Sequence, residues 1–225
     1  MDLMIAPSIL AADFGRLAEE VQAVERAGAS LIHVDVMDGR FVSEITMGPA
    51  VVRAVRRATH LPVDVHLMIV EPERHLEAFA QAGASRLAVH VEACVHLYHT
   101  LQQIAALGVR SVVALNPATP VEQVVWVLPL VTAVLVMTVE PGAGGQAFMP
   151  EMLPKIRRLA EERTERGLSF EIEVDGGIGP ATAAAAVAAG ASVLVAGSAI
   201  FGAPGGVAAA IAGLRDAARP ARRPS

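Results

Sequence analysis

The chain has 225 residues, a length typical of one α/β barrel, and we expect a single domain. Its formal net charge of -5 argues against a nucleic-acid-binding surface, and its single cysteine, Cys94, excludes an internal disulfide and a metal site built from paired cysteines. The first residues lack the positive charge and separate apolar segment of a secretory signal, and proline or glycine interrupts both long uncharged stretches, 124–139 and 181–214. We therefore expect a cytoplasmic protein without a transmembrane span.

Short runs rich in β-branched residues alternate with longer runs rich in alanine, glutamate and arginine, which predicts βα units around a parallel sheet. Eight runs are predicted strands: 4–10, 30–36, 62–68, 86–91, 110–116, 132–138, 169–175 and 192–197. Helices are expected between them, opening at cap-like residues or first-turn prolines: Asp13, Pro72, Pro120, Pro150 and Pro180. The pattern predicts an α/β fold of the (β/α)8 TIM barrel type over 1–216, with a disordered tail over 217–225.

Polar side chains occupy the C-terminal ends of three predicted strands. His33 and Asp35 are two residues apart on one strand and therefore point to the same face. The same parity places His66 and Asp175 at the mouth of the barrel, on the strands over 62–68 and 169–175. Two imidazoles and two carboxylates suit Zn, Fe, Mn or Co. We interpret the four residues as a metal site, although a His-x-Asp pair alone more often forms a simple hydrogen bond.

Other polar residues on these strands have alternative interpretations. Asp64 and Glu173 could orient a ligand histidine through a hydrogen bond, or could be buried acids satisfied by backbone or water. His90 and Glu92 repeat the two-residue spacing at the end of another strand and are a rival ligand pair. We rank this pair second because four ligands already fill the site.

Three glycine-bearing segments follow the last three predicted strands, at 141–146, 175–179 and 197–202. The last two lie where barrels often bind phosphate through backbone N–H groups and a short helix N-terminus. The first is longer, and we expect it to close over a bound substrate and exclude water.

A metal beside a phosphate-binding segment fits one reaction class. The cation would polarise a ketone and the adjacent hydroxyl while a carboxylate removes the proton between them. If Asp35 and Asp175 stand on opposite faces of the substrate, one can remove this proton and the other can return it, which inverts that carbon.

Seven motifs occur in order along the chain: APSIL (6–10), HVDVMDGRFV (33–42), VDVHLMI (63–69), ALNPATP (114–120), VLVMTVEPGAGGQAFM (134–149), EVDGGI (173–178) and GSAIF (197–201). Together they resemble the ribulose-phosphate 3-epimerase family, also called pentose-5-phosphate 3-epimerases, over nearly the whole chain. The resemblance implies interconversion of D-ribulose 5-phosphate and D-xylulose 5-phosphate through a 2,3-enediolate, in the pentose phosphate pathway or the Calvin cycle.

The resemblance also implies roles for individual residues. It makes Asp35 and Asp175 the catalytic acid/base pair, and it implies one divalent cation per subunit (Zn, Fe, Mn or Co) on His33, Asp35, His66 and Asp175, with no organic cofactor. A homo-oligomer, either dimer or hexamer, is implied, with a sugar phosphate as substrate and neither nucleic acid nor membrane as partner. The implied substrate-binding residues are Ser8, Met37, His66, Met68, Met137, Gly142, Ala143, Gly144, Gly145, Asp175, Gly176, Gly177, Gly197 and Ser198.

Three residues, at two places in the chain, depart from the family pattern. Ala143 stands where phenylalanine is usual, and Ser43-Glu44 stands where Pro-Asn is common. The smaller residue leaves open an epimerase acting on a six-carbon ketose phosphate such as allulose 6-phosphate. A non-catalytic sugar-phosphate-binding barrel is a further alternative, disfavoured by the intact acid pair. A decarboxylase with Asp-x-Lys-x-x-Asp on a strand is disfavoured because Lys155 is the only lysine and lies in a helical pattern.

Overall fold

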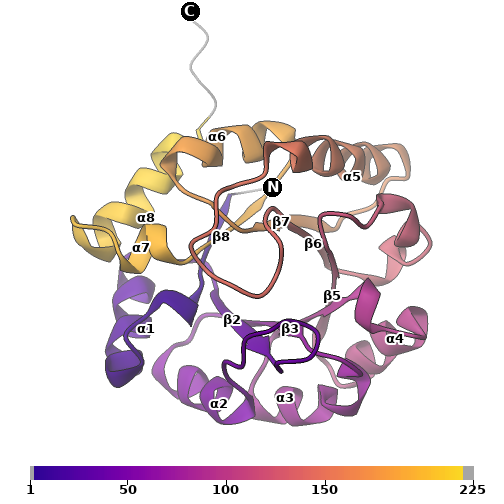
Figure 1. Cartoon of the computed structure of the whole chain (residues 1–225), viewed down its shortest axis with the longest axis horizontal. Helices are drawn as coiled ribbons and strands as arrows, with labels where there is room; N and C mark the ends of the chain where they lie inside the picture. The colour runs from indigo at the N-terminus through magenta and orange to yellow at the C-terminus, as the bar shows by residue number, and fades with distance from the viewer. Residues whose placement is uncertain (1–2, 220–225) are drawn as a thin grey trace, which may run out of the picture.

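The computed structural model describes residues 3–219 and places eight parallel strands in one sheet, in the order β1-β8-β7-β6-β5-β4-β3-β2. A parallel bridge between Ser8 and His33 joins the two ends of this order, so the sheet forms a nearly closed barrel ringed by helices (Figure 1). Every predicted strand is confirmed, with bounds that differ by at most three residues. The strands are β1 (Met4–Pro7), β2 (Ile32–Met37), β3 (Val63–Met68), β4 (Arg86–His90), β5 (Arg110–Leu115), β6 (Ala133–Met137), β7 (Glu171–Asp175) and β8 (Val193–Ala196).

Helices connect most of the strands, and proline fixes where several of them begin. Pro49 and Pro180 are the first residues of their helices, where the missing N–H costs no hydrogen bond. Pro72 and Pro150 each open a 3-10 turn that leads into an α-helix. The α-helices are α1 (Leu17–Arg26), α2 (Pro49–Ala58), α3 (Leu76–Ala82), α4 (Leu97–Ala106), α5 (Leu153–Glu165), α6 (Pro180–Ala189), α7 (Ser198–Phe201) and α8 (Gly206–Ala217).

The connection between β5 and β6 departs from the prediction of a helix opening at Pro120. It contains only two 3-10 turns, Val121–Gln123 and Leu128–Leu130. The segment is rich in β-branched valine and contains Pro129, both of which disfavour an α-helix. Val121, Val124 and Val127 are spaced by three and all buried, which matches the 3-10 repeat.

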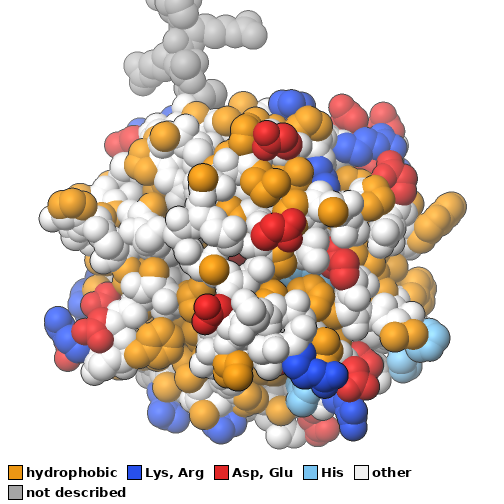
Figure 2. Space-filling model, in the orientation of Figure 1, with side chains coloured by type: hydrophobic (Ala, Val, Ile, Leu, Met, Phe, Trp, Pro, Cys, Tyr) orange, Lys and Arg blue, Asp and Glu red, His pale blue; other side chains and the backbone are white. Residues whose placement is uncertain are grey.

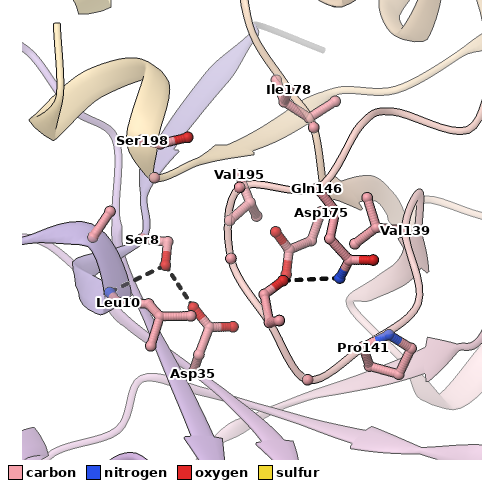
Figure 3. Close-up of a pocket in the computed structure, with 18 of the residues that line it drawn as sticks. Ser8, Leu10, Asp35, Val139, Pro141, Gln146, Asp175, Ile178, Val195 and Ser198 are labelled. Carbon is pink, nitrogen blue, oxygen red and sulfur yellow. Dashed lines mark hydrogen bonds between the residues drawn. The ribbon is translucent and has the colours of Figure 1, made fainter.

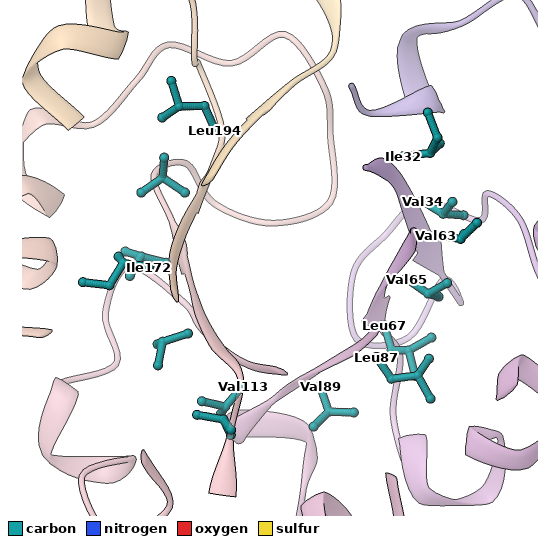
Figure 4. Packing of buried hydrophobic residues seen from close by; sticks show 14 of the residues in the cluster. Ile32, Val34, Val63, Val65, Leu67, Leu87, Val89, Val113, Ile172 and Leu194 are labelled. Atoms are coloured by element: carbon teal, nitrogen blue, oxygen red, sulfur yellow. The ribbon is translucent and has the colours of Figure 1, made fainter. Parts of the chain in front are cut away.

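Strand residues alternate between two sides of the barrel wall. Val34, Val65 and Val89 point outward into the layer covered by helices, part of which Figure 4 shows. Each such side chain is fully buried, and burial of a valine contributes roughly 1.5–3 kcal/mol. The residues between them point inward, and on β2 and β3 these include His33 and His66. The apolar shell therefore holds the wall while the interior carries polar side chains.

The end of the chain differs slightly from the expected tail over 217–225. Helix α8 continues through Ala217, and Ala218 is buried against the core. Residues 220–225 of the expected tail lie outside the described residues. No helix within residues 3–219 is both long and apolar enough to cross a membrane.

Candidate active site

Four side chains from β2, β3 and the end of β7 meet inside the barrel. His33, Asp35, His66 and Asp175 each bring one donor atom to within 4.8 Å of the other three. The Oδ1 atom of Asp35 lies 3.3 Å from Nε2 of His33 and 3.4 Å from Nδ1 of His66. The Oδ2 atom of Asp175 lies 3.8 Å and 3.7 Å from the same two nitrogens. Two imidazoles and two carboxylates thus surround one point inside the barrel.

The spacing and hydrogen bonding of these atoms fit a divalent cation. Four donors placed tetrahedrally at about 2.1 Å from a zinc ion lie about 3.4 Å apart, close to the distances above. The Nε2 atom of His33 and the Nδ1 atom of His66 are buried and have no hydrogen-bond partner. Unpartnered buried nitrogens are costly unless another group binds them. The residues therefore fit a cation of the Zn, Fe, Mn or Co type.

The two histidines direct different ring nitrogens into the cluster, because the other nitrogen of each ring contacts a second side chain. Nδ1 of His33 lies 2.8 Å from Oδ2 of Asp64, so its proton is fixed there and Nε2 is free for the cation. His66 is turned the other way, with Nε2 2.7 Å from Nε2 of His90 and Nδ1 toward the cluster. His90 and Glu92 are therefore outside the ligand cluster, and the rival ligand pair of the sequence interpretation is not formed.

Asp35 is fixed by neighbours on two sides. Ser8, at the end of β1, donates its hydroxyl to Oδ2 of Asp35 at 2.5 Å, as Figure 3 shows. The Thr46 hydroxyl donates to the backbone carbonyl of Asp35 at 2.6 Å. The Asp175 side chain is more exposed, 17% against 5% for Asp35, and lies at the end of β7 across the pocket from Ser8. One carboxylate is thus tightly held, and the other is more open to a bound molecule.

A cavity of about 860 Å³ opens above the cluster. Its described lining contains no lysine or arginine, and Glu44 and Glu140 stand on its wall. Figure 2 looks onto this face and shows acidic side chains near its centre. A phosphate in this cavity would therefore be bound by backbone N–H groups rather than by side-chain cations. The lining includes Ser8, Asp35, Met37, Met68, Met137, Gly142, Ala143, Gly144, Gly145, Asp175, Gly176, Gly177, Gly197 and Ser198.

Glycine is required where the chain passes closest to itself beside the cavity. Gly177 has φ +64°, and a Cβ there would lie 2.3 Å from the backbone nitrogen of Phe148. The segment after β6 packs against this point and crosses the barrel mouth in Figure 1. Gln146 shapes that segment by donating from Nε2 to the carbonyls of Glu140 and Ala143, at 2.7 and 2.9 Å.

The family model described as the Ribulose-phosphate 3 epimerase family matches residues 4–201 of the chain. The chain belongs to this family. It is 54% identical to the ribulose-phosphate 3-epimerase of Synechocystis over 221 residues, which cover 97% of this chain and 96% of that protein. It is 51% identical to the chloroplastic ribulose-5-phosphate-3-epimerase of Arabidopsis thaliana, over 98% of this chain and 79% of that protein. The protein is therefore an enzyme of the ribulose-phosphate 3-epimerase type.

Solved structures support the barrel fold of this epimerase. The 3-keto-L-gulonate-6-phosphate decarboxylase of Vibrio cholerae superposes with a TM-score of 0.73, covering 98% of this chain and all of that one. Its sequence identity of 16% limits the comparison to the fold.

The structure places the residues singled out in the epimerase sequence in one site, with one difference. The expected substrate-binding residues line the cavity except His66, which is fully buried in the cluster beneath it. Asp64 contacts His33, whereas Glu173 lies 3.4 Å from the same nitrogen, Nδ1. Ala143 and Glu44, two of the departures from the family pattern, both line the cavity.

Sequence reasoning missed Arg86, which lies inside the barrel below the cluster. Its guanidinium contacts Oδ1 of Asp64 at 3.1 Å, Oε2 of Glu171 at 2.8 Å and Oε2 of Glu173 at 2.6 Å. An arginine opening the predicted buried strand RLAVH was the available signal, because a buried cation needs buried anions. Arg86 thus supports Asp64, which in turn orients His33.

Buried charge shifts the pKa values of the cluster and its supports. Burial acts to lower the pKa of His33, but Asp35, Asp64 and Glu173 outweigh it and hold that pKa well above its ordinary value. The pKa of His66 is raised as well, because burial, which acts to lower it, is outweighed by the nearby Asp175 and Asp35 carboxylates. Burial and the neighbouring Asp64 raise the pKa of Glu173 to about 7. The cluster therefore carries strong negative potential, which protons or a cation can neutralise.

Proposed function

We propose that this epimerase interconverts D-ribulose 5-phosphate and D-xylulose 5-phosphate by moving one proton at C3. The observation that carries the proposal is the arrival of two carboxylates, Asp35 from β2 and Asp175 from β7, at one cavity and one metal-type cluster. Family membership supports the substrate, and the geometry supports the chemistry.

A divalent cation on His33, Asp35, His66 and Asp175 would act as a Lewis acid toward the carbonyl and hydroxyl oxygens next to C3. The rest of the mechanism belongs to the side chains. Each aspartate has one oxygen in the cluster, Oδ1 of Asp35 and Oδ2 of Asp175, and a second oxygen remains for proton transfer.

The two aspartates account for inversion at C3. Asp35 removes the C3 proton from one face of the bound sugar, and Asp175 delivers a proton to the opposite face, with the roles exchanged in reverse. The Ser8 hydroxyl, which donates to Oδ2 of Asp35, keeps this carboxylate in place, and Ser8 also lines the cavity in which the sugar would bind. Because the same two groups serve both directions, no other acid or base is needed.

Other cavity residues bind and shield the sugar phosphate. Gly176, Gly177, Gly197 and Ser198 supply backbone N–H groups suited to the phosphate. Three methionines at the strand ends, Met37, Met68 and Met137, are buried in the cavity lining, where they would exclude water from the bound sugar and strengthen the electrostatic interactions there. The segment 142–145 would close over the sugar and exclude water.

A six-carbon ketose phosphate is a second candidate substrate, because Ala143 is small and lines a cavity of about 860 Å³. The test compares kcat/KM for D-ribulose 5-phosphate and D-allulose 6-phosphate in the wild type and in Ala143→Phe. We expect the five-carbon substrate to be preferred in both proteins. A higher kcat/KM for the six-carbon substrate that Ala143→Phe removes would show that the proposed substrate is wrong.

We also propose that the enzyme forms a homo-oligomer and works in the cytoplasm, in the pentose phosphate pathway or in carbon fixation. Large apolar side chains on the surface support association, with Val95 87%, Trp126 83% and Ile45 79% exposed. Light scattering on the purified protein should give the mass of a dimer or hexamer. A mass near the 23.4 kDa of one chain would reject this proposal.

A further inference from the structure

His90 and Glu92, at the end of β4, lie outside both the ligand cluster and the cavity lining. They are nevertheless joined to the cluster by an unbroken set of contacts. Nε2 of His66 lies 2.7 Å from Nε2 of His90, and Nδ1 of His90 lies 3.2 Å from Oε2 of Glu92. The two histidines are fully buried, whereas the Glu92 side chain is 21% exposed and reaches His90 from the surface.

The contact between the two imidazoles is a hydrogen bond in the plane of the rings. Their planes differ by only 21°, and the ring centroids are 5.0 Å apart. An imidazole nitrogen lies about 1.15 Å from its ring centre, so two rings joined head-on across 2.7 Å have centroids about 5.0 Å apart. The observed separation therefore matches an N–H···N bond and not face-to-face stacking.

The position of each proton in this series of hydrogen bonds follows from Glu92, at the end away from the cluster. Oε1 of Glu92 accepts from the backbone N–H of Asn116 at 2.8 Å and from the hydroxyl of Thr119, so this carboxylate is held as an acceptor. Oε2 of Glu92 then accepts a proton carried on Nδ1 of His90. A neutral His90 with its proton on Nδ1 has a bare Nε2, which accepts from Nε2–H of His66. Nδ1 of His66 is left without a proton and points into the cluster.

The turn that holds the Glu92 carboxylate is itself held by a lysine. Lys155 of α5 donates its ammonium to the carbonyls of Asn116 and Pro117, at 2.7 and 2.8 Å. This clamp fixes the turn after β5 whose N–H and hydroxyl hold Glu92. It also gives the only lysine of the sequence a structural role.

We propose that His90 and Glu92 are positioning residues which fix the tautomer of His66 and thereby present its Nδ1 atom to the divalent cation. The inference rests on the metal site of the proposed function and goes beyond it, since neither residue touches the cation or the substrate. It also explains why His33 and His66 offer opposite nitrogens: Asp64 holds Nδ1–H of His33, whereas His90 holds Nε2–H of His66.

Glu92→Gln is the sharpest perturbation, because it reverses the direction of the hydrogen bonds from Glu92 through His90 to His66 without changing the size of the side chain. The glutamine oxygen must face the Asn116 N–H and the Thr119 hydroxyl, which turns its NH2 group toward His90. His90 must then accept on Nδ1 and carry its proton on Nε2, which forces the His66 proton onto Nδ1. That form of His66 cannot bind a cation, and we expect zinc affinity to fall about 10- to 100-fold.

Three further proteins separate positioning from general damage. His90→Gln keeps an acceptor for His66, and we expect near-normal zinc affinity, whereas His90→Leu removes the acceptor and should weaken zinc binding about as much as Glu92→Gln. Glu162→Gln is the matched control: Glu162 is also buried and hydrogen-bonded, but it pairs with Arg158 on α5 away from the site. Its zinc affinity should equal that of the wild type.

The measurements are zinc affinity of the full chain by competition with a chelating dye, thermal unfolding of each metal-free variant, and nitrogen-15 NMR of the imidazoles in the zinc-loaded wild type. The NMR spectra should show protons on Nε2 of His66 and Nδ1 of His90. A His90 proton on Nε2, or zinc affinity in Glu92→Gln within about twofold of wild type, would overturn the inference alone. A wild type that binds no zinc, cobalt, manganese or iron would overturn the inference together with the metal site of the proposed function.

Discussion

Replacing Arg86 by methionine should destabilise the protein strongly although Arg86 lies outside the cavity lining. The guanidinium is 2% exposed and contacts three carboxylates. Glu171 is 24% exposed and can be hydrated, but Asp64 and Glu173 are 1% and 0% exposed and would keep their charges in the barrel interior. Removing one member of a buried ion pair costs about 3–5 kcal/mol, because the remaining charge is uncompensated.

The barrel has one means of reducing this cost. The pKa of Glu173 is already raised to about 7, so this carboxyl can take up a proton when the Arg86 guanidinium is removed. Asp64 then remains as the main uncompensated charge. We therefore expect a loss of about 3–5 kcal/mol in the free energy of unfolding, which corresponds to a decrease of about 10 °C in Tm for a chain of this size.

Urea and thermal unfolding of the metal-free protein measure this change directly. Arg86→Met/Asp64→Asn should recover part of the loss, because the second substitution removes the main uncompensated charge. Arg16→Met is the control, since the Arg16 and Glu19 side chains form an ion pair that is 64% and 66% exposed and should leave Tm unchanged. A loss below about 1 kcal/mol in Arg86→Met would refute the reasoning that buried charge compensation holds this part of the barrel.

Three further predictions concern the site itself. Asp35→Asn and Asp175→Asn should each reduce kcat to below a few percent of wild type, since each removes a proposed ligand and a proton carrier, while Ser8→Ala should mainly raise KM; equal losses in all three would contradict the assigned roles. Gly177→Ala should raise KM for the sugar phosphate and lower Tm, because its Cβ would meet the backbone of Phe148; unchanged kinetics would show that this turn does not bind phosphate. The pKa values of His33 and His66 are raised, so a cation must displace protons from them in order to bind. Zinc affinity should therefore fall as the pH is lowered, by up to about 100-fold per pH unit where two protons are displaced. A zinc affinity that does not change with pH would contradict the ligand assignment.

The barrel could be predicted because its signals are local. Each strand is a short β-branched run between glycine, proline or charged segments, and two-residue parity decides which side chains face inward. That parity predicts that His33, Asp35, His66 and Asp175 face one another, and the structure places their donor atoms within 4.8 Å of one another. The prediction of a helix between β5 and β6 was wrong. Pro120 is a typical helix start, but the valines that follow it favour a 3-10 repeat.

What the sequence could not show depends on contacts between distant segments. Arg86 pairs with Glu171 and Glu173, 85 and 87 residues away, and no local pattern links them. The two-residue spacing of His90 and Glu92 was visible, but it indicated a ligand pair equally well. The short distance from His90 to His66 shows that His90 contacts a proposed metal ligand and is not itself in the ligand cluster.

Proton NMR of D-ribulose 5-phosphate, incubated with the purified protein in deuterated water with and without a strong chelator, tests the central claim most directly. The account predicts xylulose 5-phosphate carrying deuterium at C3, formed much more slowly after the metal is removed and restored when a divalent cation is returned. If neither product nor exchange at C3 appears with metal supplied, the proposed reaction is contradicted. If turnover continues unchanged in the chelator-treated protein, the cluster of His33, Asp35, His66 and Asp175 does not depend on a cation for catalysis.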